Sequence, residues 1–177
     1  DDAGKEPSGN YYRYSRNSGL EPLRLPSVLI TNTFQFSPDG TVFYTCDSAE
    51  QEILSFDCEC PTGKVTGRKV FANTFELGGF PDGSAIDSEG CLWTCLWDAS
   101  RVVRFTPDGE VDRVILLAAP RPTSLAFGGD DLKTLFITTA RAGLTFPQLD
   151  SRPLSGSLFS IRVDVAGLPP REFGRSA

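Results

Sequence analysis

The sequence predicts an all-β protein built from repeated antiparallel sheets, the architecture of a β-propeller. Short runs rich in β-branched and aromatic residues alternate with turns that contain Gly, Asp or Pro. No convincing amphipathic helix interrupts these runs. A segment of similar pattern also returns about every 40–50 residues, which is the length of one four-stranded propeller blade.

The expected strands follow one another with turn chemistry between them. Pro presets the first turn dihedral and Gly supplies a positive φ, as in the turns "SPDG" (37–40), "PTG" (61–63), "SEG" (88–90) and "TPDG" (106–109). The predicted strands are Tyr11–Tyr14, Ile30–Phe36, Val42–Asp47, Ile53–Asp57, Val65–Phe71, Ser84–Asp87, Leu92–Leu96, Val102–Phe105, Val111–Leu116, Ser124–Phe127, Leu135–Thr139 and Leu158–Val163.

The repeat sets the domain organisation. "TNTFQFSPDGTVFYT" (31–45) overlays "PDGSAIDSEGCLWTC" (81–95) at an offset of fifty residues, and "PTSLAFGGDDLKTLFIT" (122–138) is a third copy. Residues 9–177 are therefore predicted to form a partial propeller, with blades starting near residues 30, 80 and 121. The segment before residue 30 supplies only the outer strands of a preceding blade, and residues 1–8 are a disordered or truncated lead-in. Because propellers close with about four to eight blades, we expect a fragment, or a chain that needs a missing amino-terminal half.

Composition excludes several function classes. The net charge of −6 disfavours nucleic acid and acidic membranes as partners, and no apolar run is long enough to cross a bilayer. The absence of His removes Ser-His-Asp chemistry and His-ligated metals. The five cysteines lack zinc-site spacing, so we expect buried, reduced thiols and a cytoplasmic protein.

The overlay places Asn32, Asp82 and Thr123 at the start of the innermost strand of successive blades. In a propeller these points converge at one end of the central channel, where amide and carboxylate oxygens suit a hard cation. Asn and Asp beside Gly or Pro are also common turn formers. A metal site and a purely structural role therefore both remain open from spacing alone.

Other polar and aromatic residues receive structural interpretations. Phe34 and Phe36 are expected to be buried by their strand. Trp93 is read as core between blades, whereas Trp97, on the same face of the strand, is a candidate for the pocket rim. The carboxylates are read as turn or cap residues (Asp39, Asp47, Asp57 and Asp108), and Arg141 as solvated.

Four segments together resemble the carboxy-terminal half of the senescence marker protein/gluconolactonase/regucalcin-like family. These are "ITNTFQFSPDG", "FPDGSAIDSEGCLWTCLWDASRVVRFTPDGEV", "PTSLAFGGDDLKTLFITTAR" and "GSLFSIRVDVAGLPPREF". The resemblance implies a six-bladed propeller, of which this chain supplies about three full blades and the outer strands of a fourth. It also implies hydrolysis of a sugar lactone, and thus a role in carbohydrate metabolism, with one divalent metal, commonly Ca²⁺ or Zn²⁺; Mg²⁺ and Mn²⁺ are further candidates.

The resemblance implies roles for two residues of this chain. Asn32 matches a metal-binding Asn of the family, and Asp82 matches a metal-binding Asp that is also proposed as the catalytic base. The third ligand, a Glu, and the sugar-contacting residues belong to the half of the family sequence that is not present here. Thr33 stands where the family usually has Gly, and with Thr123 and Trp97 it is a candidate for lining the pocket.

Two other functions remain compatible with the sequence. The first is a non-catalytic calcium-binding propeller with a regulatory or structural role, and the second is an inactive fragment of the enzyme. An enzyme should turn over a lactone in a metal-dependent way, whereas a binding module should show only stabilisation by the metal.

Overall fold

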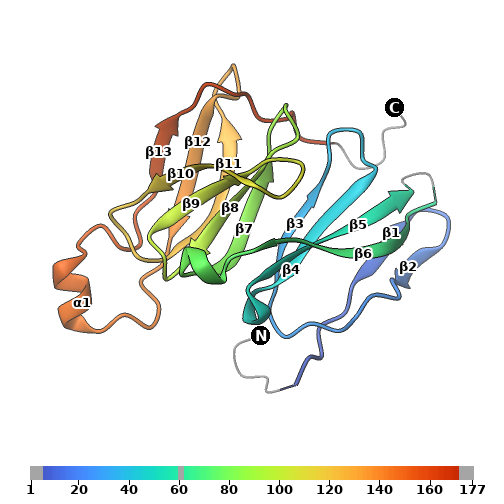
Figure 1. The fold of residues 1–177 in the computed structure, drawn as a ribbon, viewed down its shortest axis with the longest axis horizontal. Coiled ribbons are helices and arrows are strands. Elements are labelled where there is room, and N and C mark those ends of the chain that lie inside the picture. Colours follow the sequence, from blue (N-terminus) through green and yellow to red (C-terminus); the bar gives the residue numbers. More distant parts are fainter. Residues whose placement is uncertain (1–5, 60–61, 172–177) are drawn as a thin grey trace.

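The computed structural model describes residues 6–59 and 62–171, and in this part of the chain the strands form four antiparallel sheets (Figure 1). We call the four-stranded sheet β3-β4-β5-β6 the first sheet, β10-β9-β8-β7 the second sheet and the three-stranded β11-β12-β13 the third sheet; β1 and β2 form a separate pair. The strands are β1 (Tyr12–Ser15), β2 (Gly19–Pro22), β3 (Thr31–Phe36), β4 (Val42–Asp47), β5 (Glu52–Glu59), β6 (Lys64–Asn73), β7 (Phe80–Ile86), β8 (Leu92–Trp97), β9 (Arg101–Phe105), β10 (Val111–Leu116), β11 (Pro122–Gly128), β12 (Thr134–Thr139) and β13 (Phe159–Arg162).

Every predicted strand coincides with an observed one, and the ends differ by at most two residues except in β7, which begins at Phe80 rather than at Ser84. One strand, β2, and one helix, α1 (Phe146–Ser151), were not predicted. Nor were two short 3-10 turns, Ser48–Glu50 after β4 and Phe75–Leu77 after β6. The signal for α1 is a capping box between Thr145 and Gln148 with Pro147 in the first turn between them, rather than an amphipathic pattern. The third sheet has three strands in the described residues instead of the expected four, and α1 lies between β12 and β13.

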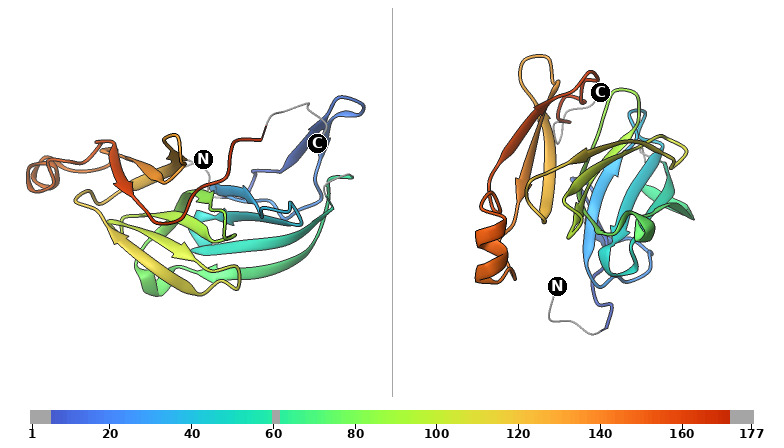
Figure 2. Two further views of the ribbon diagram at one scale, coloured as in Figure 1. Left: turned by 90° about the horizontal axis from the view of Figure 1, so that it is seen from above. Right: turned by 60° about the vertical axis from the view of Figure 1, so that its left-hand side comes forward.

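The ribbon views of Figure 2 show the sheets from two further sides. Apolar side chains fill the spaces between neighbouring sheets. Along β8, Leu92 and Leu96 pack toward the first sheet, while Trp93 and Cys95 pack toward the third. This alternation is the two-residue period of a strand buried on both faces. Trp93 is fully buried and meets Phe127 edge-on, which confirms it as core between sheets.

The first strands of the three sheets lie side by side, with β7 next to both β3 and β11. Each of these strands carries an irregularity in its pairing near its start: between Asn32 and Gln35, between Pro81 and Ser84, and between Pro122 and Ser124. A β-bulge inserts an extra residue and redirects the side chains around it. The repeat therefore preserves a bulge at the position where polar ligands were expected.

The bulge in β3 overturns one expectation. Phe34 was expected to be buried, but its side chain is 54% exposed, whereas Thr33 is 2% exposed. Because strand residues alternate between faces, one extra residue exchanges the buried and exposed positions. Phe34 still contacts Phe43, with ring centroids 4.8 Å apart.

A buried ion network anchors the outer end of the second sheet. The carboxylate of Asp87 accepts hydrogen bonds from the Trp93 indole and the Arg104 guanidinium, each at 2.8 Å. Arg104 also pairs with Glu89 and Asp112, so three carboxylates surround one buried guanidinium. These contacts raise the pKa of Arg104, although desolvation by burial opposes them most strongly. This arginine is therefore structural.

The segment after β13 returns across the sheets toward the first one, as the red trace in Figure 2 shows. Gly167 forms a bridge with Asp87, and the guanidinium of Arg171 donates to the carbonyls of Ser37 and Pro38 at 3.3 and 2.7 Å. Residues far apart in sequence are thereby tied together.

Several smaller expectations are also resolved. Cys46, Cys91 and Cys95 are buried thiols, but Cys58 is only half-buried, and Cys60 lies outside the described residues. Asp39 accepts from Ser37 and Thr41 in its turn, and Asp47 caps the 3-10 turn that follows β4, which confirms both structural interpretations. Of the predicted lead-in, residues 1–5 lie outside the described residues, as does the end of "GLPPREF". None of the helices in the described residues is long and apolar enough to cross a membrane.

Candidate functional site

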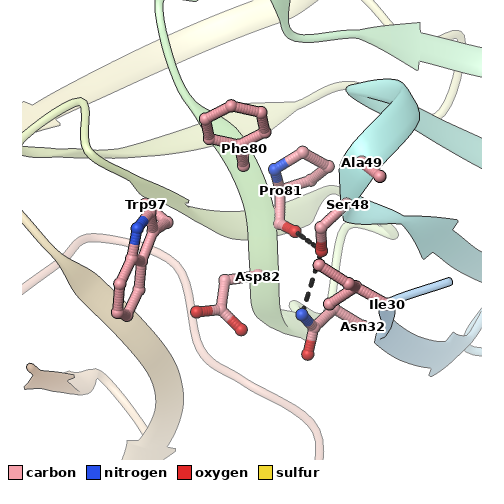
Figure 3. Close-up of a pocket in the computed structure, with 8 residues that line it drawn as sticks. All are labelled: Ile30, Asn32, Ser48, Ala49, Phe80, Pro81, Asp82 and Trp97. Atoms are coloured by element: carbon pink, nitrogen blue, oxygen red, sulfur yellow. Dashed lines mark hydrogen bonds between the residues drawn. The ribbon is translucent and has the colours of Figure 1, made fainter. Parts of the chain in front are cut away.

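A cavity of about 550 Å³ lies where the first sheet meets the starts of β7 and the end of β8 (Figure 3). The 3-10 turn after β4 closes one side of it. It is lined by Ile30, Asn32, Ser48, Ala49, Phe80, Pro81, Asp82 and Trp97. Both predicted ligands and one of the three predicted pocket residues therefore face the same space.

Asn32 is held by its amide nitrogen. Its Nδ2 donates to the Ser48 hydroxyl at 2.9 Å, and that hydroxyl donates to the Pro81 carbonyl at 2.6 Å. Ser48 is 6% exposed, so this chain of hydrogen bonds is shielded from water. The bond to Ser48 orients the amide so that its oxygen, the metal-binding atom of an Asn, is not used in that bond (Figure 3).

Asp82 is a half-buried carboxylate in the bulge of β7. Desolvation by burial raises its pKa to about 6, and a hydrogen bond from the Gly83 backbone N–H opposes this only in part. No ion pair joins Asp82 to any Arg or Lys in the described residues. A carboxylate placed this way lacks a positive counter-charge from the described part of the chain.

Thr33 lies behind the cavity rather than on its lining. It adopts a left-handed backbone conformation with φ +47°, which is the conformation that Gly tolerates best. Its hydroxyl donates to the backbone carbonyl of Asp82 at 2.8 Å, which joins β3 to β7. The Thr33 hydroxyl therefore holds the backbone of Asp82 in place from the side away from the cavity.

Thr123 does not join the cavity residues either. Its hydroxyl is hydrogen-bonded to that of Thr138 at 2.7 Å, within the third sheet. The structure thus brings together Asn32 and Asp82, the first two members of the predicted convergence, and separates the third from them.

The chemistry of the cavity suits a hard cation in part. Asn32 and Asp82 offer one amide oxygen and one carboxylate, the ligand types that calcium prefers, although calcium takes about six to eight oxygens in all. No group of three His, Cys, Asp or Glu residues with metal-site geometry occurs among residues 6–59 and 62–171. Two side chains with suitable oxygens therefore line the cavity, and a cation there would need water or further groups to complete its shell.

Ser48 is the residue of this site that sequence reasoning did not single out. Its signal was present in the repeat, because the overlay that pairs Asn32 with Asp82 also pairs Ser48 with Asp98. Its role depends on a contact with Pro81 in the next sheet, which spacing along one strand does not reveal.

The comparisons with known proteins identify the family. Residues 1–141 match the model of the SMP-30/Gluconolactonase/LRE-like region. The chain belongs to this family. Among curated members it is 39% identical to L-arabinolactonase from Azospirillum brasilense, over 97% of this chain and 57% of that protein. It is 38% identical to 6-deoxy-6-sulfogluconolactonase from Pseudomonas putida and 35% identical to regucalcin from Sus scrofa. These two alignments cover 79% and 81% of this chain and 48% of each relative.

Solved structures of SMP-30/gluconolactonase/LRE-like proteins share the fold. A calcium-binding protein named regucalcin from Agrobacterium tumefaciens superimposes with a TM-score of 0.84 at 28% identity, over 93% of this chain and 57% of that one. A gluconolactonase from Xanthomonas campestris gives a TM-score of 0.62 at 26% identity, over 73% of this chain and 41% of that one. The all-β class is thus confirmed, and the chain spans about half the length of the relatives it matches; the number of blades stays a prediction.

Proposed function

We propose that the protein containing this chain hydrolyses a sugar lactone with the help of a divalent metal ion held by Asn32 and Asp82. The observation that carries the proposal is the cavity in which an uncompensated carboxylate and an oriented amide lie side by side in the lining. The names of relatives, L-arabinolactonase and 6-deoxy-6-sulfogluconolactonase, support a sugar lactone as the substrate class.

The chain's own residues have distinct tasks in this reaction. A divalent cation bound there, Ca²⁺ or Zn²⁺ in the first instance and Mg²⁺ or Mn²⁺ as further candidates, would polarise the lactone carbonyl and make water more acidic. Asp82 accepts a proton from the water whose oxygen attacks the carbonyl carbon. The ring C–O bond then breaks, the leaving alkoxide takes up a proton, and the product is a hydroxy acid. Asn32, fixed through Ser48, contributes a neutral oxygen and needs no protonation change.

A second function has a specific observation in its favour. The structural relative with TM-score 0.84 is named a calcium-binding protein, and regucalcins are among the curated relatives. The same two oxygen ligands would serve a calcium-binding protein without turnover. The two functions differ in what the bound metal does, and therefore in whether it accelerates a reaction.

The proposal is tested by stripping the protein of metal, adding a lactone, and measuring the acid released as the lactone is hydrolysed. We expect hydrolysis of L-arabino-1,4-lactone or D-glucono-1,5-lactone above the spontaneous rate only after a divalent metal is restored. Activity that survives a chelator would contradict the metal requirement. A rise in the unfolding temperature with Ca²⁺, with no turnover of either lactone, would favour the binding protein instead. Because the chain spans about half of its relatives' length, the assay uses these residues together with any flanking sequence that the natural protein carries.

A further inference from the structure

The wall of the cavity opposite Asn32 is a single indole held by an arginine. Trp97, at the end of β8, lines the cavity on the far side of Asp82 from Asn32 (Figure 3). The guanidinium carbon of Arg121, which immediately precedes β11, lies 4.8 Å from the centroid of the Trp97 ring. At this distance a guanidinium over an aromatic ring forms a cation–π contact. The contact therefore restricts rotation of the Trp97 indole, which lies between the second and third sheets.

Two further contacts fix the arginine itself. Its Nε donates to Asp98 Oδ1 at 2.6 Å, and it also donates to the backbone carbonyl of Ala142 in the segment before α1. The Arg121 side chain is 15% exposed and that of Asp98 is 42% exposed. Asp98 has φ +64°, a left-handed conformation that Asp tolerates better than most residues, so the turn after β8 directs its carboxylate to Arg121 at modest cost. We call Arg121 and Asp98 the clamp.

The two tryptophans of the chain separate core from cavity. Trp93 lies on the same face of β8 but is fully buried among the side chains between the second and third sheets. Trp97 is only half-buried and is the one that reaches the cavity. A core function needs no clamp on a partly exposed indole, whereas a recognition surface benefits from one that is held rigid.

We propose that Trp97 is a specificity-determining residue that packs against the C–H face of a small polyhydroxylated ring, and that the clamp positions it. The cavity would then have one polar side, made by Asn32 and Asp82, and one aromatic side. A sugar lactone has matching sides, a carbonyl edge and an apolar ring face. This inference rests on the proposed function and adds to it the feature that recognises the ring. Arg121 and Asp98 act through Trp97 and do not touch the substrate.

Steady-state kinetics with L-arabino-1,4-lactone test both parts of the inference. Trp97→Ala is expected to raise KM by about 10-fold or more while kcat changes little, because aromatic packing stabilises bound ground state and transition state alike. Arg121→Met keeps the length of the side chain but loses the cation, and is expected to raise KM by about 3- to 10-fold. Arg121→Lys should recover part of this loss. The matched control is Arg113→Met, which breaks an arginine–aspartate pair with Asp164 away from the cavity and should leave KM unchanged.

Fluorescence supplies a readout that does not depend on turnover. In a protein with Trp93→Phe, and with any tryptophan of the flanking sequence also replaced by Phe, the emission reports on Trp97. We expect this emission to respond to the product, L-arabinonate, with a saturable titration, and Arg121→Met in this background should weaken that titration. Turnover by the parent with an unchanged KM in Trp97→Ala would show that Trp97 does not recognise the ring, and would leave the proposed function standing. A fluorescence response without any turnover would contradict the proposed function but support the role of Trp97 in binding. Neither turnover nor response would overturn both.

Discussion

Two corners of the molecule occupy equivalent places in successive repeats but use different chemistry. In the first sheet, the hydroxyl of Ser48 donates to the carbonyl of Pro81 at the start of the second sheet, at 2.6 Å. In the second sheet, fifty residues later, the carboxylate of Asp98 accepts from Arg121 at the start of the third sheet, also at 2.6 Å. Both contacts fasten one sheet to the first strand of the next. The first corner is neutral and the second is charged.

The two contacts differ in how the nearby carboxylate is compensated. At the charged corner the carboxylate and the guanidinium compensate one another within the chain. Asp82 follows Pro81 directly, next to the neutral Ser48–Pro81 contact, and has no such partner in the described residues. Its carboxylate is half-buried, and desolvation by burial raises its pKa to about 6. In an ion pair, the attraction between the two charges offsets part of the cost of their desolvation. A buried carboxylate without such a partner would be stabilised by a bound cation. Within the described residues, the carboxylate of one junction is thus paired with an arginine, while Asp82 at the other has no ion-pair partner, which is the contrast on which the proposed cation site rests.

The largest effect is expected from replacing Asp82, the carboxylate without an ion-pair partner. Asp82→Asn keeps the shape but removes both the charge and the proton acceptor. We expect kcat for sugar-lactone hydrolysis to fall by roughly 10²–10⁴-fold, the usual contribution of a positioned general base. Asp98→Asn, at the charged corner, should act mainly on KM. Asp57→Asn, an exposed carboxylate beside Lys69, serves as the control and should match the parent. Wild-type kcat in Asp82→Asn would remove Asp82 from the mechanism.

The sequence predicts the repeated features of the molecule better than the contacts between sheets. Alternation and turn residues were sufficient for every strand except β2, and the fifty-residue offset was sufficient to pair Asn32 with Asp82 in one cavity. Both are properties of a local pattern. The exposure of Phe34 was missed because a bulge at Thr33 interrupts the alternation without changing the composition.

The clamp and the Ser48 contact were missed for a different reason. Arg121 and Trp97 meet only because two sheets pack together, and nothing in either segment alone specifies the other. Thr123 differs from both, because the overlay assigned it to the convergence but its hydroxyl bonds within its own sheet instead. Equivalent repeat positions share backbone geometry, while the partner of each side chain depends on contacts that the repeat does not specify.

A smaller effect is expected from a methyl group at the repeat position equivalent to Thr33. A Cβ on Gly83 would lie 2.7 Å from the Thr123 carbonyl oxygen and 2.5 Å from the Ser124 hydroxyl oxygen. Gly83→Ala should therefore cost about 2–3 kcal/mol of unfolding free energy, because the two first strands must separate. Gly78→Ala is the comparison, since its Cβ meets nothing within 4 Å and only the positive φ opposes it, at about 1 kcal/mol. Chemical denaturation measures both, and equal costs would contradict the crowding.

Ser48→Ala tests the neutral corner directly. It removes the hydroxyl that donates to the Pro81 carbonyl, leaving the weaker Cys46 thiol donor at 3.6 Å, and it releases the Asn32 amide, so we expect a loss of about 1–2 kcal/mol in unfolding free energy. The rise in unfolding temperature produced by Ca²⁺ should also become smaller, since Asn32 is no longer oriented. Ser160→Ala, an exposed position on β13, controls for removing a hydroxyl. An undiminished calcium effect would mean that Ser48 supports only the fold.

Thr33 should give the smallest change, because two opposing contributions meet in one residue. Its φ of +47° disfavours a β-branched side chain by about 1–2 kcal/mol, while its hydroxyl forms the hydrogen bond to the Asp82 carbonyl. Thr33→Gly relieves the first and loses the second, so we expect a net change below about 1 kcal/mol. Thr33→Ser keeps the bond and should be the most stable of three variants, whereas Thr33→Ala keeps the strain without the bond and should be the least stable. If Thr33→Ala were as stable as Thr33→Ser in chemical denaturation, the hydrogen bond between β3 and β7 would contribute nothing, and the neutral corner would depend on Ser48 alone.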